Sequence, residues 1–213
     1  MFAGANLMVA GALGLCLVLS ACTSAYKHLR VINGDPGCIQ QFKPALGTAM
    51  YNTQVDVVGK HLSGILVMKQ MPDSSTRIVF TSEMGLTFFD FAFLADGQFK
   101  VYHIMDKMNK KAVIKTLRKD FELILMEHTP VSGARVLSDG INHFYGFPQE
   151  KGINYYITDS TCSHLIKAQK ASSKKAIVEA TLNDYKAGIP DSIAIVHQVF
   201  QFTIILNRLY GTQ

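Results

Sequence analysis

The chain has 213 residues, a formal net charge of +5 at pH 7 and no tryptophan. That charge is mildly basic for this length and permits contact with anionic lipid. A net charge of this size does not indicate nucleic-acid binding, which usually needs a dense basic patch, so we expect no nucleic acid among the partners. The length suits one domain with a well-buried core, and no internal repeat or low-complexity segment divides it.

An uncharged segment opens the chain. No Asp, Glu, Lys or Arg precedes Lys27, and the most apolar part runs over residues 7–19. This length matches the apolar region of a secretory signal and is short for a membrane span of about 20 residues. Small residues and then Cys22 follow it. The sequence therefore predicts that the rest of the chain is exported.

The stretch LSAC, which ends at Cys22, resembles the lipobox of bacterial lipoproteins. In that family the cysteine receives a diacylglyceryl thioether, the chain is cut before it, and the new amine is usually acylated. The resemblance implies a signal peptide over residues 1–21 and an acylated Cys22 that anchors the protein in a membrane. Because Thr23 rather than Asp follows the cysteine, it also implies the outer membrane, facing the periplasm.

Two features of this segment leave alternatives open. A signal normally carries Lys or Arg near its start, and none precedes Lys27, so an uncut transmembrane anchor is the second interpretation. Cys16 also follows a leucine at lipobox spacing, but the bulky Leu15 precedes it, which makes Cys22 the better candidate. Either interpretation ties the chain to a membrane.

Two further cysteines, Cys38 and Cys162, lie in the exported part. An oxidising compartment favours a disulfide between them, and two separate thiols are the alternative. The bridge would close a long loop and stabilise the fold by about 4–5 kcal/mol in the loop-entropy model.

Residues 22–48 contain GDPG and are expected to form a tether and entry segment, followed by a single domain over 49–213. Alternating apolar residues then predict strands, separated by the turn sequences PDSS, EMG and ADG. These first strands are expected at 61–69, 75–83, 86–94 and 97–105.

A helix is predicted from about Asp106 to Met126, with Asp106 or Asn109 as its N-cap. Apolar residues recur there at helical spacing, at Val113, Ile114, Leu117, Phe121 and Ile124. A basic stripe lies beside them, at Lys111, Lys115, Arg118 and Lys119. This stripe is expected to be an ordinary solvated helix face, and contact with lipid head groups is the alternative.

Strand patterns resume after the helix, beginning with a hairpin on Asp139-Gly140, a dipeptide that two-residue turns prefer. Further strands are expected at 153–159, 163–170, 175–185, 192–197 and 201–209. The fold class predicted from this order is mainly β with α (α+β). A curled antiparallel sheet of about ten to twelve strands should form a half-open barrel, covered by one or two helices.

Two stretches, 63–93 and 189–209, resemble the opening strands and the closing pair of the LolA/LolB-like lipoprotein-carrier fold. They cover under a third of the exported chain, and no functional residue of the family can be matched to this chain one by one. Members of that family hold lipoprotein acyl chains in an apolar cavity and pass them to the outer membrane. The resemblance therefore implies a lipid or acylated-protein ligand.

An apolar cavity with few polar groups suits a lipid tail, and the aromatic strand residues are its candidate lining. An ordinary packed core is the alternative for the same residues. Methionines would add adaptability to such a lining, and those considered are Met68, Met84, Met105 and Met108. The aromatic candidates are Phe89, Phe91, Phe93, Phe99, Phe200 and Phe202.

Motifs for catalysis, metal binding and nucleotide binding are not apparent in the sequence. We therefore predict no enzyme, no metal and no cofactor, although catalytic groups assembled in space leave no local signature. The leading hypothesis is a membrane-anchored carrier or receptor for a lipid or acylated ligand. A structural or assembly lipoprotein that binds an unknown protein partner is the second, and an acyl-processing enzyme is the third.

Overall fold

The computed structural model describes residues 24–127 and 129–210. Thirteen strands form one antiparallel sheet in the order β1-β7-β8-β9-β10-β11-β12-β13-β2-β3-β4-β5-β6. The predicted fold class is confirmed, with thirteen strands instead of ten to twelve. The strands are β1 (Arg30–Val31), β2 (Thr48–Val57), β3 (Lys60–Gln70), β4 (Thr76–Thr81), β5 (Thr87–Phe93), β6 (Phe99–Ile104), β7 (Arg135–Ser138), β8 (Asn142–Pro148), β9 (Ile153–Asp159), β10 (Leu165–Ala171), β11 (Ala176–Lys186), β12 (Ile189–His197) and β13 (Phe202–Leu209).

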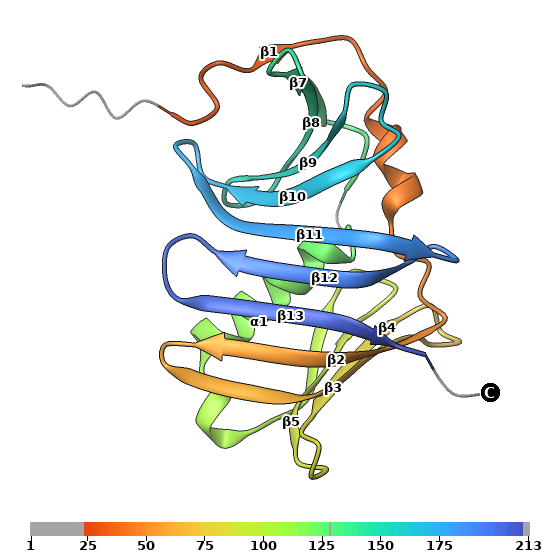
Figure 1. Cartoon of the computed structure of the whole chain (residues 1–213), viewed down its shortest axis with the longest axis vertical. Helices are drawn as coiled ribbons and strands as arrows, with labels where there is room; N and C mark the ends of the chain where they lie inside the picture. Colours follow the sequence, from red (N-terminus) through yellow and green to blue (C-terminus); the bar gives the residue numbers. More distant parts are fainter. Residues whose placement is uncertain (1–23, 128, 211–213) are drawn as a thin grey trace, which may run out of the picture.

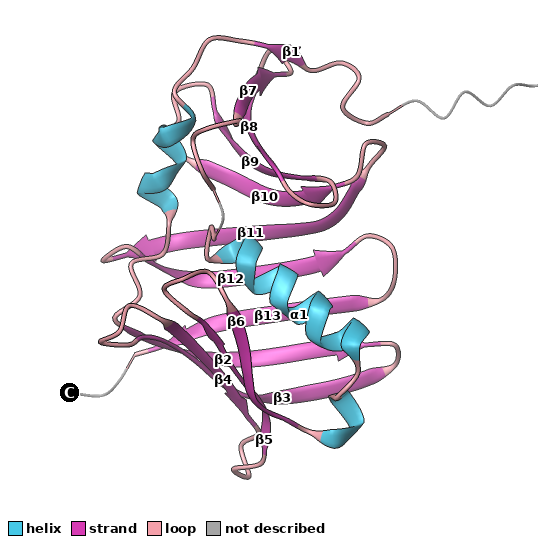
Figure 2. Ribbon diagram, turned by 180° about the vertical axis from the view of Figure 1, so that it is seen from behind, coloured by secondary structure: helices cyan, strands magenta, loops and turns pink. Residues whose placement is uncertain are grey.

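The sheet curves strongly without closing, and a helix lies across its concave face (Figures 1 and 2). The helical segments are η1 (Pro36–Phe42), η2 (Asp106–Met108) and α1 (Lys111–Ile124). Every pair of neighbouring strands is antiparallel, and most are joined by short turns. Near the middle of the sheet, β13 pairs with β2, although these two strands are far apart in the sequence and are not joined by a turn.

The pairing of β13 with β2 sets the face that the helix covers. Phe202 lies opposite Val57, Ile204 opposite Val55, and Leu206 opposite Thr53. Since side chains alternate along a strand, the apolar members of these pairs point to one face. They point to the concave face, where Phe202, Ile204 and Leu206 are all buried.

Helix α1 begins at Lys111, so the predicted start at Asp106 is wrong. Residues Asp106–Met108 form a separate 3₁₀ turn, and the backbone of Lys110 is extended (φ −125°, ψ 134°), which prevents one continuous helix. Neither Asp106 nor Asn109 is the N-cap, and Lys110 takes that place without a side-chain hydrogen bond. The apolar stripe was correctly placed, with Leu117 and Phe121 buried against the sheet.

The hairpin between β7 and β8 is confirmed, but its loop has three residues, 139–141. Asp139 Oδ1 accepts hydrogen bonds from the backbone N–H groups of Ile141 (2.8 Å) and Asn142 (2.7 Å). Gly140 has φ +97°, a conformation that glycine adopts without strain. Asp139 and Gly140 therefore form the turn as predicted, but the loop has one residue more than the two-residue turn that this dipeptide prefers.

The segment before residue 48 takes part in the fold. β1 pairs with β7, and η1 buries Ile39 and Phe42 in the main core. Asp35 caps η1 by accepting a hydrogen bond from the Gly37 N–H at 2.8 Å. This entry segment therefore covers one end of the sheet. The predicted signal peptide at 1–21 and the lipidation site Cys22 lie outside the described residues.

Candidate functional site

A cavity of about 570 Å³ lies between the concave face of the sheet and helix α1. Its size falls within the range of small-molecule sites. β2, β3, β4, β5 and β13 form the sheet wall, and the segment from Met105 to Phe121 forms the other. The lining is mostly apolar and includes Val55, Leu62, Leu66, Phe80, Phe89, Val113, Leu117, Phe121, Phe202 and Ile204.

Side-chain size along α1 explains why this space stays open. The first half of the helix presents Ala112, Val113 and Thr116 to the cavity, and these side chains are short. The second half presents Phe121, which is fully buried and lies 5.9 Å from the Phe89 ring centroid. The helix therefore packs tightly at its C-terminal half and leaves room at its N-terminal half.

Strand β3 extends beyond β4 and forms one side of the cavity mouth. Pairing between the two strands begins at Ile65 and Thr81. A Cβ atom on Gly64 would lie 2.0 Å from the Thr81 carbonyl oxygen, so only glycine allows the chains to approach this closely there. Lys60 and Leu62, on the extension before this point, line the cavity.

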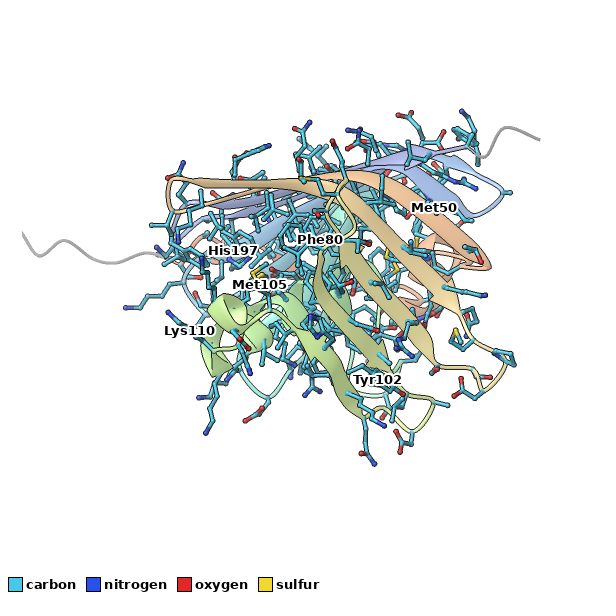
Figure 3. The ribbon with its side chains drawn as sticks, turned by 90° about the horizontal axis from the view of Figure 1, so that it is seen from below. Met50, Phe80, Tyr102, Met105, Lys110 and His197 are labelled. Carbon is cyan, nitrogen blue, oxygen red and sulfur yellow. A yellow bond between two sulfur atoms is a disulfide. The ribbon has the colours of Figure 1, made fainter. Side chains whose placement is uncertain are left out.

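The mouth of the cavity is cationic. Lys60, Lys107 and Lys110 are exposed and belong to the lining. Met105 and Met108, both half-buried, lie between them and the apolar interior. Figure 3 shows Met105 and Lys110 on the same side of the molecule, with Phe80 further inside. The site thus has an apolar interior and a positively charged rim.

The predicted aromatic set divides into two groups. Phe89, Phe200 and Phe202 line the cavity, whereas Phe91, Phe93 and Phe99 do not. Those three pack on one another next to the cavity, with Phe91–Phe99 and Phe93–Phe99 centroid distances of 5.1 Å. Phe91 is fully buried, so a charge introduced there would test stability and not binding.

Sequence reasoning missed two of the aromatic lining residues. Phe80 lies on the alternating strand predicted at 75–83, and Phe121 lies on the apolar stripe of the predicted helix. Alternation along the strand and the helical stripe carried the signal for both. Of the four methionines considered, Met105 and Met108 line the cavity, Met68 is buried in the core and Met84 is 97% exposed.

A second cavity, of about 490 Å³, lies at the other end of the strands. It is lined by several polar groups, including Gln70, Ser74 and Asp96, together with the Lys43–Glu127 ion pair at 3.5 Å. Phe93 is one of its few large apolar members. This composition suits an apolar chain much less well than the cavity under α1.

A buried hydrogen-bonded pair joins α1 to the sheet beside the first cavity. His197 Nε2 lies 2.9 Å from Asp120 Oδ2, and their side chains are 5% and 1% exposed. Burial raises the pKa of the Asp120 carboxyl above its usual range, and the hydrogen bond from His197 opposes that shift. The His197 ring also packs on Phe200 and Phe202, at centroid distances of 4.7 and 4.8 Å.

This pair has the residue types of a general-base dyad, but no nucleophile of the described residues is hydrogen-bonded to it. His197 Nδ1 is buried and has no hydrogen-bond partner among the residues that the structure describes. No Ser, Thr or Cys of that part of the chain is therefore hydrogen-bonded to it, as acyl transfer by a triad requires. The same described ranges contain no group of three His, Cys, Asp or Glu side chains that could hold a metal ion.

The structure places Cys38 of η1 and Cys162 of the β9–β10 turn in a disulfide, with Cα atoms 6.5 Å apart. Gln41 supports this junction by donating a hydrogen bond from Nε2 to the Cys162 carbonyl oxygen at 2.7 Å.

Of the basic stripe on α1, Arg118 and Lys119 pair with Glu122, at 2.7 and 2.6 Å. Over the described ranges, no helix is both long and apolar enough to cross a membrane.

Comparison with known proteins gave matches among solved structures. No family model matches the sequence, and no curated protein does. Solved structures similar to this chain include a LolA superfamily protein from Nitrosomonas europaea, with TM-score 0.48, 7% identity, and 85% of this chain and 96% of that chain covered. A DUF1329 family protein from Desulfovibrio piger gives TM-score 0.44 and 10% identity, over 82% of this chain and 88% of that one.

A domain from Vibrio parahaemolyticus described as an outer membrane lipoprotein-sorting protein gives TM-score 0.43 and 8% identity, over 83% of this chain and 90% of that chain. Because all three TM-scores lie below 0.5, we take no functional conclusion from these structures.

Proposed function

We propose that this protein is a non-catalytic carrier or receptor that holds the apolar chain of a lipid or acylated ligand beneath helix α1. The observation that supports this proposal is the 570 Å³ cavity with an apolar interior and a rim of Lys60, Lys107 and Lys110. The rim favours an amphiphile with an anionic head group, because the head can meet the lysines while the tail is buried. We further propose that Cys22 carries the lipid anchor and that the domain faces the periplasm from the outer membrane.

Burial of a hydrocarbon chain provides enough free energy for useful affinity. Each methylene removed from water contributes about 0.8 kcal/mol, so about ten methylenes contribute about 8 kcal/mol before the cost of ordering the chain. That sum corresponds to micromolar binding. The half-buried Met105 and Met108 at the entrance are flexible and polarizable, which allows tails of different length or shape to enter.

A cavity-blocking variant tests the proposal. Thr116→Trp places an indole in the cavity from α1 and should exclude about three methylenes of the ligand, which corresponds to about 2.4 kcal/mol or roughly 60-fold weaker binding. Lys115→Trp is the matched control, because Lys115 is exposed on the same helix and does not line the cavity. Binding of cis-parinaric acid, a fluorescent fatty acid, is titrated for both variants.

Two results would contradict the carrier function. The first is wild-type protein that binds no fatty acid and yields no co-purifying lipid in native mass spectrometry. The second is unchanged affinity in a folded Thr116→Trp variant, which would place the fatty acid elsewhere. Either result would favour the alternative, a structural or assembly lipoprotein acting through protein–protein contacts.

A further inference from the structure

Four stretches of the chain lie along one edge of the sheet, which we call the lysine edge. They are the β2–β3 turn with its following lysine (58–60), the η2 region (105–111), the β10–β11 turn (172–175) and the β12–β13 turn (198–201). The three turns lie on the left of Figure 1, at the same ends of adjacent strands. A backbone hydrogen bond from Val58 N–H to the Gln201 carbonyl at 3.1 Å links the β2–β3 and β12–β13 turns, and Gln198 N–H donates to the carbonyl of Ile177 in the adjacent strand β11 at 2.9 Å.

The lysine edge is strongly asymmetric in charge. Asp106 is the single acidic residue of these four stretches, and the turns 82–86 and 149–152, at the same strand ends, add Glu83, Glu150 and Lys151. Among the described residues, none of the lysines in the four stretches takes part in an ion pair, so their charges are available to a partner. The turns 71–75, 94–98 and 187–188 at the opposite edge contain Asp73 and Asp96 and no lysine or arginine, and Lys43 and Lys186 beside them are each paired with an acidic residue, at 3.5 and 2.8 Å. The six lysines of the lysine edge are Lys60, Lys107, Lys110, Lys111, Lys174 and Lys175.

Large apolar side chains are exposed among these lysines. Val58 is 70% exposed, Val199 57% and Phe200 45%, and all three lie in the turns of the lysine edge. Lysines interspersed with exposed apolar residues characterise surfaces that lie in the interface of an anionic bilayer. Phe200 also lines the cavity under α1, so the exposed apolar surface continues into the cavity mouth.

The path of the N-terminal segment brings the lysine edge close to the predicted anchor. Ser24 donates a hydrogen bond from Oγ to the Ser173 carbonyl at 2.6 Å, and the Ala25 N–H donates to the Lys174 carbonyl at 2.7 Å. Both acceptors belong to the β10–β11 turn of the lysine edge. Cys22 precedes Ser24 by two residues, a span of at most about 7 Å. A lipid on Cys22 would therefore hold the membrane surface next to this turn.

We propose that the lysine edge docks on an anionic lipid bilayer. In the docked state Val58, Val199 and Phe200 enter the head-group region, and the cavity mouth faces the lipid. An amphiphile can then pass between bilayer and cavity without crossing bulk water. The docking itself rests on the lysine edge and not on occupancy of the cavity, so the two proposals can fail separately.

The natural absence of tryptophan allows a single-probe experiment. Val199→Trp reports on the lysine edge and does not line the cavity. Tyr210→Trp is the matched probe beyond the far end of β13, about 26 Å away along eight strand residues. The full chain carrying either probe is reconstituted in phosphatidylcholine vesicles with or without phosphatidylglycerol, and quenching by brominated phosphatidylcholine is measured.

We expect strong quenching of the Val199→Trp probe in vesicles with phosphatidylglycerol, and little quenching of the Tyr210→Trp probe. Adding Lys174→Gln and Lys175→Gln to the Val199→Trp protein should shift the docking equilibrium about 25-fold toward the undocked state, since each lysine near an anionic surface contributes about fivefold. High salt should act in the same direction. Neither lysine lines the cavity, so fatty-acid affinity in solution should not change.

Equal quenching of the two probes, or no quenching at Val199→Trp in the anionic vesicles, would overturn the docking proposal. Quenching that is the same in neutral and anionic vesicles and insensitive to the lysine changes would also overturn it, because the charges would then play no part. Failure of the Thr116→Trp binding test would leave these outcomes unaffected.

Discussion

We predict that two substitutions in the buried pair of Asp120 and His197 each lower the free energy of unfolding alone and largely cancel when they are combined. Asp120 Oδ2 on α1 lies 2.9 Å from His197 Nε2 at the end of β12, and both side chains are almost fully buried. Apart from His197, Lys170 is the cation that acts on the Asp120 carboxyl, and burial lowers the pKa of Lys170 itself. Loss of either member of the pair therefore leaves a buried polar group without adequate compensation.

The magnitudes follow from this enclosure. Breaking a buried pair by removing one partner costs about 3–5 kcal/mol. His197→Phe leaves the buried Asp120 carboxyl without its hydrogen-bond partner, and Asp120→Leu leaves both ring nitrogens of His197 unpaired. Replacing both members by apolar groups of similar shape is often neutral or stabilising by about 1–4 kcal/mol. A phenyl ring at position 197 can keep the packing on Phe200 and Phe202.

Urea denaturation of wild type, the two single variants and the double variant measures the coupling free energy. We expect each single variant to lose several kcal/mol and the double variant to unfold near the wild-type midpoint. Since neither side chain lines the cavity, fatty-acid binding by the double variant should be unchanged. The reasoning would be refuted if the double variant lost as much free energy of unfolding as the two single variants together, because the destabilisation would then not come from leaving one partner of the pair buried alone.

Two further predictions concern the β9–β10 turn. Replacing Cys38 and Cys162 together by alanine should lower the free energy of unfolding by about 4–5 kcal/mol, because the bridge spans 124 residues; a urea midpoint equal to that of the oxidised wild type would contradict this. Hydrogen bonds, chiefly from Ser163, lower the pKa of Asp159 from 3.8 to about 2. Its stabilising effect should therefore be complete above pH 3.8 and be lost as the pH falls toward 2. Asp159→Asn should be less stable at pH 7 and flatten thermal unfolding midpoints over that acid range, and an unchanged pH profile would count against this role.

Periodicity in the sequence was sufficient to predict the helix and most of the sheet, because alternation and helical spacing report directly on which side chains face the core. Strands β1 (Arg30–Val31) and β2 (Thr48–Val57) were not predicted, although β2 alternates between buried and exposed residues along most of its length. Periodicity was insufficient near residues 105–110, where the extended backbone of Lys110 interrupts the helix. It also could not predict which strand ends would meet. The pairing of β13 with β2 brings Phe202 beside Val57, and nothing local in either strand specifies that contact.

Whether an apolar face becomes core or cavity depends on volumes summed across elements that are distant in sequence. Phe89 and Phe91 belong to the same strand and stack at 4.5 Å, yet the first lines the cavity and the second does not. The difference arises on the opposite wall, where α1 presents the short Ala112 and Thr116 near its start and the large Phe121 further along. A sequence pattern marks all these positions as apolar or small without showing which of them face each other. The cavity under α1 is therefore a property of the helix placed against the sheet, and the Asp120–His197 pair, at the tightly packed half of α1, provides one buried contact that holds it there.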